Sequence, residues 1–233
     1  MKAIKWLLLA VGVALCFAPC AVAQDPQLTL VGVGGQTQGD YYIYPYYIEV
    51  SSPGVNYVAP MVCDDFSDEI GMGSTWEANA YTINDLSSLL FASGPAGGGA
   101  YAGGLITGTY NAYADAITLA AALMGVGSAP AGYTNGEIQM AIWYIFNPTG
   151  VAGNLNGVTM AQIQALIAWA ASNQLTLAQL LNWTIWTPGN CVAGSCPGQE
   201  FFQYPEGGTA LGYLLLAGVS CFGAMFFKRG AHA

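Results

Sequence analysis

Apolar and β-prone residues are concentrated in four short segments in the first third of the chain. Tyrosine and β-branched residues are frequent in these segments, and Gly, Pro, Asn and Ser separate them, which is the pattern of β-strands and turns. The four predicted strands are LTLVGV (28–33), YYIYPYYIEV (41–50), VNYVAPMVC (55–63) and TWEANAYTI (75–83). We therefore expect this region to be mainly antiparallel β.

From about residue 84 to 181 the apolar residues recur at helical spacing instead. The predicted helices cover 84–91, 110–124, 135–147, 159–172 and a short segment from 176. Three of them begin with Thr followed three residues later by Glu or Gln, which is the pattern of a capping box. The three pairs are Thr134 with Glu137, Thr159 with Gln162, and Thr176 with Gln179.

Strand-like residues return at 182–187 and 200–204, after the helical region. The predicted fold is therefore α+β, with one exported domain over 24–204 in which a helical insertion, about 84–181, interrupts a mainly antiparallel β structure. The two ends of the chain have a different composition and are treated separately.

The N-terminus has the pattern of a secretory signal peptide. Lys2 and Lys5 precede an apolar run, and Ala21 and Ala23 are small residues at the positions that a signal peptidase reads. We expect residues 1–23 to be removed before Gln24 and the remainder to be exported.

The C-terminal segment 205–233 is predicted to be an anchor. Residues 209–227 form an uncharged apolar run, long enough for one transmembrane helix, and Lys228 and Arg229 follow it directly, which places that end in the cytoplasm. With Pro205 and Glu206 in front, the segment resembles the PEP-CTERM sorting tail of Gram-negative bacteria. The resemblance implies an exosortase-like processing enzyme as a partner, and a protein that is anchored in the envelope or released after processing.

Charged residues make up only 7% of the chain, and their positions exclude several functions. All four Lys and Arg residues and the one His lie in the two end segments, while the thirteen acidic residues lie between Asp25 and Glu206. Nucleic-acid binding needs basic residues, and His-based triads and zinc sites need an imidazole, so the exported domain is expected to have neither. No cofactor is expected.

The exported domain contains three cysteines. Cys191 and Cys196 flank a short Gly-containing turn, and in an oxidising compartment we predict a disulfide between them. Cys63 is then unpaired, and its thiol is either a small buried apolar group or a reactive group.

Gln139 is an unusual residue for its place in the helix predicted from residue 135. It begins an apolar stripe that continues through Trp143 and Phe146. A buried carboxamide is costly unless its donors and acceptors have partners, so we expect a specific partner for this side chain.

Cys63 and Gln139 together resemble the thioester domains of bacterial surface adhesins. In that family a cysteine near the end of a strand is bonded to a glutamine in the pattern hydrophobic-Gln-x-x-hydrophobic-aromatic, which Ile138 to Trp143 matches. The Tyr/Ala-rich preceding helix, with Tyr110 and Tyr113, is also similar. The resemblance implies a Cys63–Gln139 thioester, shielded from water by Trp143, that an amine or hydroxyl of a partner opens to form a covalent link.

Four carboxylates lie close together directly after Cys63: Asp64, Asp65, Asp68 and Glu69. Paired carboxylates perform glycoside hydrolysis, and clustered oxygen ligands bind calcium, although the spacing is not that of a calcium-binding loop. The interpretation that we favour from sequence is a solvated acidic turn after a strand.

The predicted function is that of an exported, envelope-anchored surface binding or adhesion protein, not an enzyme. Its partner would be a surface amine, hydroxyl or polysaccharide. Two alternatives stay open: a non-covalent structural component of the exopolysaccharide matrix, and a carboxylate-dependent polysaccharide-active enzyme.

Overall fold

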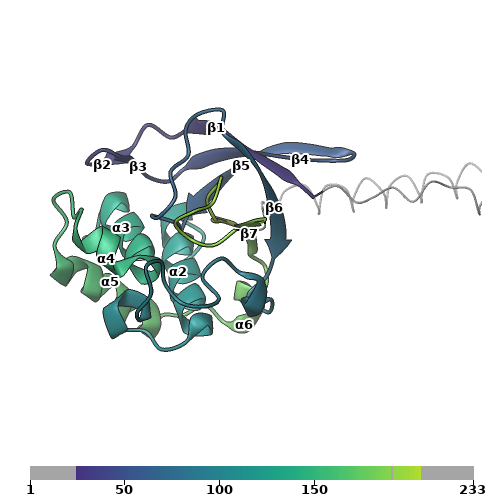
Figure 1. Ribbon diagram of the computed structural model, residues 1–233. Helices are drawn as coiled ribbons and strands as arrows, with labels where there is room; N and C mark the ends of the chain where they lie inside the picture. Colours follow the sequence, from purple (N-terminus) through teal and green to yellow (C-terminus); the bar gives the residue numbers. More distant parts are fainter. Residues whose placement is uncertain (1–24, 190, 206–233) are drawn as a thin grey trace, which may run out of the picture.

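The computed structural model describes residues 25–189 and 191–205, with strands gathered on one side and helices on the other (Figure 1). The predicted signal peptide, Glu206 of the sorting motif and the predicted transmembrane segment 209–227 lie outside these residues. Within the described part, no helix is both long and apolar enough to cross a membrane.

Six antiparallel strands close into a barrel, which confirms the mainly antiparallel β character. Their order around the barrel is β1-β4-β5-β8-β7-β6. The strands are β1 (Gln27–Val33), β4 (Tyr46–Ser52), β5 (Val55–Cys63), β6 (Thr75–Tyr81), β7 (Thr184–Pro188) and β8 (Phe201–Gln203). A separate small ladder joins β2 (Thr37–Gln38) to β3 (Tyr41–Tyr42).

The predicted strand 41–50 is divided in two by Pro45, which has no backbone N–H to donate to a neighbouring strand. Strand alternation then directs one face of each barrel strand inward. The inward side chains form a buried core that includes Leu28, Leu30, Ile48, Val50, Met61, Cys63, Trp76 and Phe201.

The helices form one insertion between β6 and β7, as expected. They are α2 (Thr109–Met124), α3 (Asn135–Phe146), α4 (Pro148–Ala152), α5 (Met160–Ser172) and α6 (Leu177–Leu180), with single 3₁₀ turns η1 (Leu86–Ser88) and η2 (Tyr101–Gly104). All three predicted capping boxes are present, at the starts of α3, α5 and α6.

Two local predictions differ from the structure. The helix expected over 84–91 is only the 3₁₀ turn η1. The short helix α4 was not predicted, and it follows α3 at once because the side chain of Asn147 accepts the N–H of Gly150 and Pro148 stands at the first helical position.

Helix α3 lies at the centre of the helical part. It packs against α2 and α5, and every residue from Ile138 to Phe146 is buried. It is therefore a core helix, not a helix with one apolar face, and its first turns point toward the barrel.

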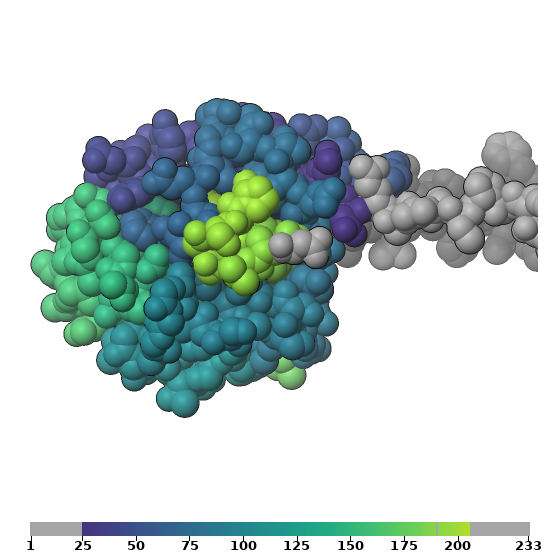
Figure 2. Space-filling view, in the orientation of Figure 1, coloured from purple at the N-terminus to yellow at the C-terminus, as the bar shows by residue number. Residues whose placement is uncertain are grey.

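The segment that closes the domain lies between the two parts. Figure 2 shows residues 191–205 in yellow-green at the centre of one face, with earlier, blue parts of the chain above them and teal parts below. This segment carries the Cys191–Cys196 disulfide and strand β8.

Candidate functional site

Cys63 is the last residue of β5, at the end of the barrel that adjoins the helices. It pairs with Phe201 of β8, and its side chain belongs to the barrel core, with no exposed surface. Because successive side chains of a strand point to opposite faces, the next residue, Asp64, is directed toward the helices.

Gln139 is brought to Cys63 by helix α3. The capping box at Thr134 and Glu137 fixes where this helix begins, and so fixes the side from which Gln139 projects. The carboxamide is fully buried; its Nε2 donates to the backbone oxygen of Cys63 at 2.7 Å, and its Oε1 accepts the N–H of Tyr44 at 3.4 Å. The two residues predicted to act together are therefore neighbours.

The thiol of Cys63 is held neutral by its surroundings. Burial raises its pKa well above the ordinary value, and the charges of Asp65 and Asp64 raise the pKa further. Its Sγ donates to the backbone oxygen of Asp65 at 3.2 Å. Contact between Sγ of Cys63 and the side-chain carbon of Gln139 stays a prediction.

Trp143 lies beside the thiol, one helical turn after Gln139. Its indole N–H has no hydrogen-bond partner among the described residues, yet it is near enough to Cys63 to oppose the rise in the thiol pKa. The contact between the two groups therefore lacks the geometry of a hydrogen bond. Phe66 and Tyr41 pack against the ring, with centroids 5.1 and 6.0 Å away.

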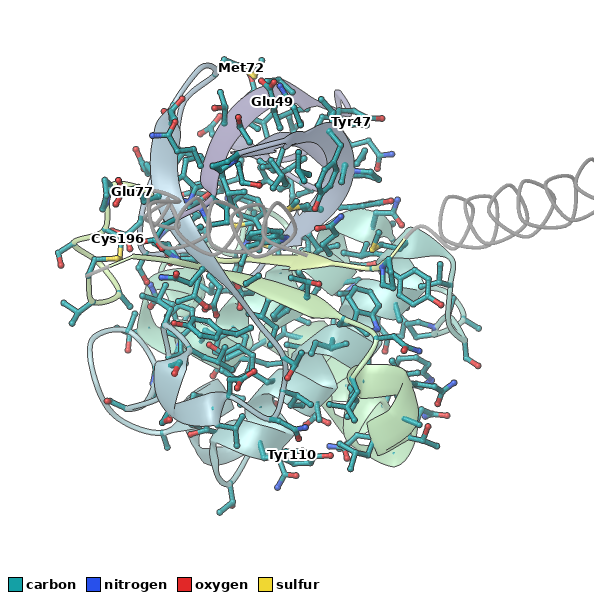
Figure 3. All side chains as sticks on the ribbon, turned by 90° about the vertical axis from the view of Figure 1, so that its right-hand side faces the viewer. Tyr47, Glu49, Met72, Glu77, Tyr110 and Cys196 are labelled. Atoms are coloured by element: carbon teal, nitrogen blue, oxygen red, sulfur yellow. A yellow bond between two sulfur atoms is a disulfide. The ribbon has the colours of Figure 1, made fainter. Side chains whose placement is uncertain are left out.

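A cavity of about 460 Å³ opens over this aromatic cluster. Leu30 and Tyr46 of the barrel core line it, so the cavity lies at one end of the barrel. Met72 is on its rim, and Figure 3 shows Met72 at the far end of the molecule from Tyr110 of α2. Trp143 also lines the cavity, as do Tyr46 and Asp65, which interact with Cys63 as well.

The acidic residues after Cys63 do not form the solvated turn expected from sequence. Asp64 and Asp65 are completely buried, Asp68 is nearly so, and only Glu69 is exposed. Backbone donors explain part of this burial: Asp65 accepts the N–H of Ser67 at 2.7 Å, and Asp68 accepts those of Gly194 and Cys196 at 2.8 and 3.0 Å.

The calcium alternative receives no support from the described residues. Within them, no three acidic, histidine or cysteine side chains are arranged to hold a metal ion. Glu69 in particular is exposed, whereas the other three carboxylates are buried.

Glu200 is a buried site residue that the sequence analysis missed. The β5–β8 register, which pairs Val62 with Phe202 and Cys63 with Phe201, places Glu200 opposite Asp64. Its carboxylate accepts hydrogen bonds from the Tyr113 hydroxyl at 2.5 Å, from the Leu90 N–H at 3.0 Å and from the Thr187 hydroxyl. In the sequence, the position of Glu200 directly before the apolar pair Phe201-Phe202 was the only indication that this acid is buried.

Asp64 and Glu200 are buried neighbours, and each affects the pKa of the other. Burial and then the charge of Glu200 raise the pKa of Asp64 well above its ordinary value, whereas the donors around Glu200 oppose the rise that burial causes in its own pKa. Both carboxyls are therefore harder to ionise than in water, Asp64 more so than Glu200. Neither side chain has exposed surface, and neither lines the cavity at the barrel end, so this pair does not face a ligand bound there.

The cysteine predictions are confirmed. Cys191 and Cys196 form a disulfide with a Cα–Cα distance of 5.3 Å, and Cys63 is a free, buried thiol.

Comparison of the chain with protein-family models, with curated proteins and with solved structures gives no match in any of the three.

Proposed function

We propose that this chain is an exported surface-binding protein that attaches covalently to its partner through a thioester between Cys63 and Gln139. The observation that carries the proposal is the fully buried Gln139 carboxamide, whose Nε2 donates to the backbone oxygen of Cys63 at 2.7 Å. The glutamine thus meets the one free cysteine of the described residues at the junction of barrel and helices.

Thioester formation would need only the groups that are present. The Sγ–H of Cys63 adds to the side-chain carbonyl carbon of Gln139, a C–S bond forms, the C–N bond breaks, and the sulfur's proton leaves with the nitrogen as ammonia. Groups held in the reacting geometry gain effective molarities of roughly 10⁵ to 10⁸ M, which compensates for the poor reactivity of an amide.

The surroundings of Cys63 favour the bonded state over a free thiolate. Burial and the neighbouring Asp64 and Asp65 penalise a negative charge on sulfur. A thioester carries no charge and leaves no thiol to ionise, so it satisfies the same apolar site without that penalty.

The second step is the transfer to a partner. An amine or hydroxyl attacks the thioester carbon, the C–S bond breaks, and the sulfur of Cys63 takes up the proton that the nucleophile loses. The described residues contain no lysine, so no side-chain amine of this domain competes with the partner. Export, anchoring by segment 209–227 and processing by an exosortase-like enzyme would place this chemistry at the cell surface.

A non-covalent role in the extracellular matrix is the second candidate. It is favoured by the cavity at the barrel end, which is lined by aromatic and acidic side chains and would bind a ligand without any reaction at Cys63.

Intact-mass measurement of the purified full chain tests the thioester. We expect one ammonia less than the processed sequence requires, and a gain of one methylamine after treatment with that amine. Cys63→Ala and Gln139→Ala should show neither change, whereas Gln179→Ala, which alters the capping glutamine of α6, should show both. A wild-type protein of full mass whose Cys63 reacts with iodoacetamide when folded contradicts the proposal.

A further inference from the structure

The cavity at the barrel end combines two kinds of side chain. Its aromatic residues are Tyr41, Tyr42, Tyr46, Phe66 and Trp143, and its carboxylates are Asp40, Asp65, Asp68 and Glu69. None of the described residues is Lys, Arg or His, so no side-chain cation of this domain neutralises these carboxylates.

Asp65 supplies a second, independent indication of a ligand. Its side chain is completely buried and lines the cavity, and its Oδ2 has no hydrogen-bond partner among the described residues, although Oδ1 accepts the N–H of Ser67. A buried acceptor of this kind is costly when it is left unpaired. Burial raises the pKa of Asp65 most, and the charge of Asp68 raises it further, so a cation beside the two carboxylates would stabilise the ionised form of Asp65.

Aromatic faces and carboxylates together favour an organic cation. A positively charged nitrogen is attracted to the faces of Tyr and Trp rings, and it donates charge-assisted hydrogen bonds to carboxylates. A metal ion is disfavoured, since no described group of three ligating side chains is arranged to hold one.

The volume of the cavity distinguishes between ammonium ligands. About 460 Å³ is in the range of pockets that enclose a whole small molecule, and it is more than one extended lysine side chain fills. A sugar ring that carries an ammonium group would stack on the aromatic rings and direct its nitrogen to Asp65. We propose that this cavity binds the ammonium-bearing residues of an amino-sugar polymer, and that such a residue is the acceptor of the thioester.

Recognition by the cavity stands on its own, whereas the covalent part of this inference rests on the proposed function. In the covalent step the ammonium gives one proton to the Asp65 carboxylate, and the neutral amine attacks the thioester carbon of Gln139. A C–N bond forms, the C–S bond breaks, and the sulfur of Cys63 takes the second proton. Trp143, which lines the cavity one helical turn after Gln139, would lie beside the attacking amine.

Calorimetry on the full chain in detergent tests recognition, with Cys63→Ala as the background so that binding is reversible. The probes are the β-1,4-linked glucosamine trimer, its fully N-acetylated form and Nα-acetyl-lysine amide. We expect the glucosamine trimer to bind at least about tenfold more tightly than either of the others. Asp65→Asn keeps an oxygen acceptor for Ser67, and it should weaken the binding of the glucosamine trimer by about the same factor. Glu77→Gln removes an exposed carboxylate outside the cavity, and it should leave the affinity for the glucosamine trimer unchanged.

The inference is overturned if the acetylated trimer binds as tightly as the glucosamine trimer, or if the lysine amide does. The three probes are compared on the same Cys63→Ala protein, so this comparison remains valid even if the Asp65→Asn variant does not fold. The covalent step is tested separately by intact-mass measurement, in which the wild-type protein should gain the mass of one glucosamine trimer. If Cys63→Ala binds the glucosamine trimer tightly but the wild type forms no adduct, recognition by the cavity is supported and the thioester is contradicted. If the wild type forms a methylamine adduct but Cys63→Ala does not prefer the glucosamine trimer, the thioester is supported and recognition of amino sugars is contradicted.

Discussion

At the residue scale, Trp143 has the most testable role, because it lines the cavity one helical turn after Gln139 and is predicted to shield the thioester. Trp143→Ala should admit water and increase the rate of thioester hydrolysis several-fold, whereas Trp143→Phe, which retains a ring, should stay near the wild-type rate. Peptide mass spectrometry measures the hydrolysis, because hydrolysis converts Gln139 to Glu. Circular dichroism checks the fold, since truncating a buried Trp costs about 3–5 kcal/mol. Equal hydrolysis rates in all three proteins would contradict shielding by Trp143.

The sequence predicted some site residues and missed others for a physical reason. Gln139 was found because the capping box is local and fixes the phase of the helix, so that a polar residue at an apolar position was visible. Glu200 was missed because its environment depends on the pairing of β5 with β8, which are far apart in the chain. For the same reason the burial of Asp64 was not apparent, since an acid after a strand usually faces water.

At the scale of elements, the loop that carries the disulfide is tied to the acidic turn through Asp68. Its carboxylate accepts the N–H groups of Gly194 and Cys196. Asp68→Ala should leave both donors without this acceptor and lower the free energy of unfolding by roughly 1–3 kcal/mol. It should also increase the rate at which a thiol reduces the disulfide. Denaturant unfolding measures the first effect and timed alkylation the second. Glu69→Ala, at the exposed neighbour, is the control, and an equal effect there would contradict the prediction.

Local signals also explain which elements were predicted correctly. The helices with capping boxes were found, as were the strands that are rich in tyrosine and β-branched residues and bounded by turn residues. The break before β4 and the extra helix α4 each depend on one proline, and the sequence interpretation gave too little weight to Pro45 and Pro148. The closure of the barrel joins β1 to β6 and β5 to β8, pairings that hydrophobic periodicity cannot specify.

For the whole molecule, acidic residues without cationic partners determine how stability depends on pH. Burial raises the pKa of Asp64, Asp65 and Glu200, and it raises the pKa of Asp115 to about 6, against the opposing hydrogen bond from Gln174. The folded state therefore holds protons that the unfolded chain, with its ordinary carboxyl pKa near 4, has released. The stability that these protonated groups contribute is fully present below about pH 4, and it is lost as the pH rises through their pKa values in the folded state.

Thermal unfolding should accordingly show a midpoint that falls as the pH rises from about 4 to above 6. Added salt at pH 8 should recover part of the loss, because it screens the repulsion between carboxylates. Asp115→Asn keeps the hydrogen-bond geometry with Gln174 but cannot ionise, so it should flatten the pH curve and raise the free energy of unfolding at pH 7 by about 1 kcal/mol. Glu77→Gln, at an exposed position on β6, should leave the slope unchanged. A midpoint that rises between pH 4 and pH 6 in the wild type would show that these buried carboxyls are ionised on folding, contrary to the prediction.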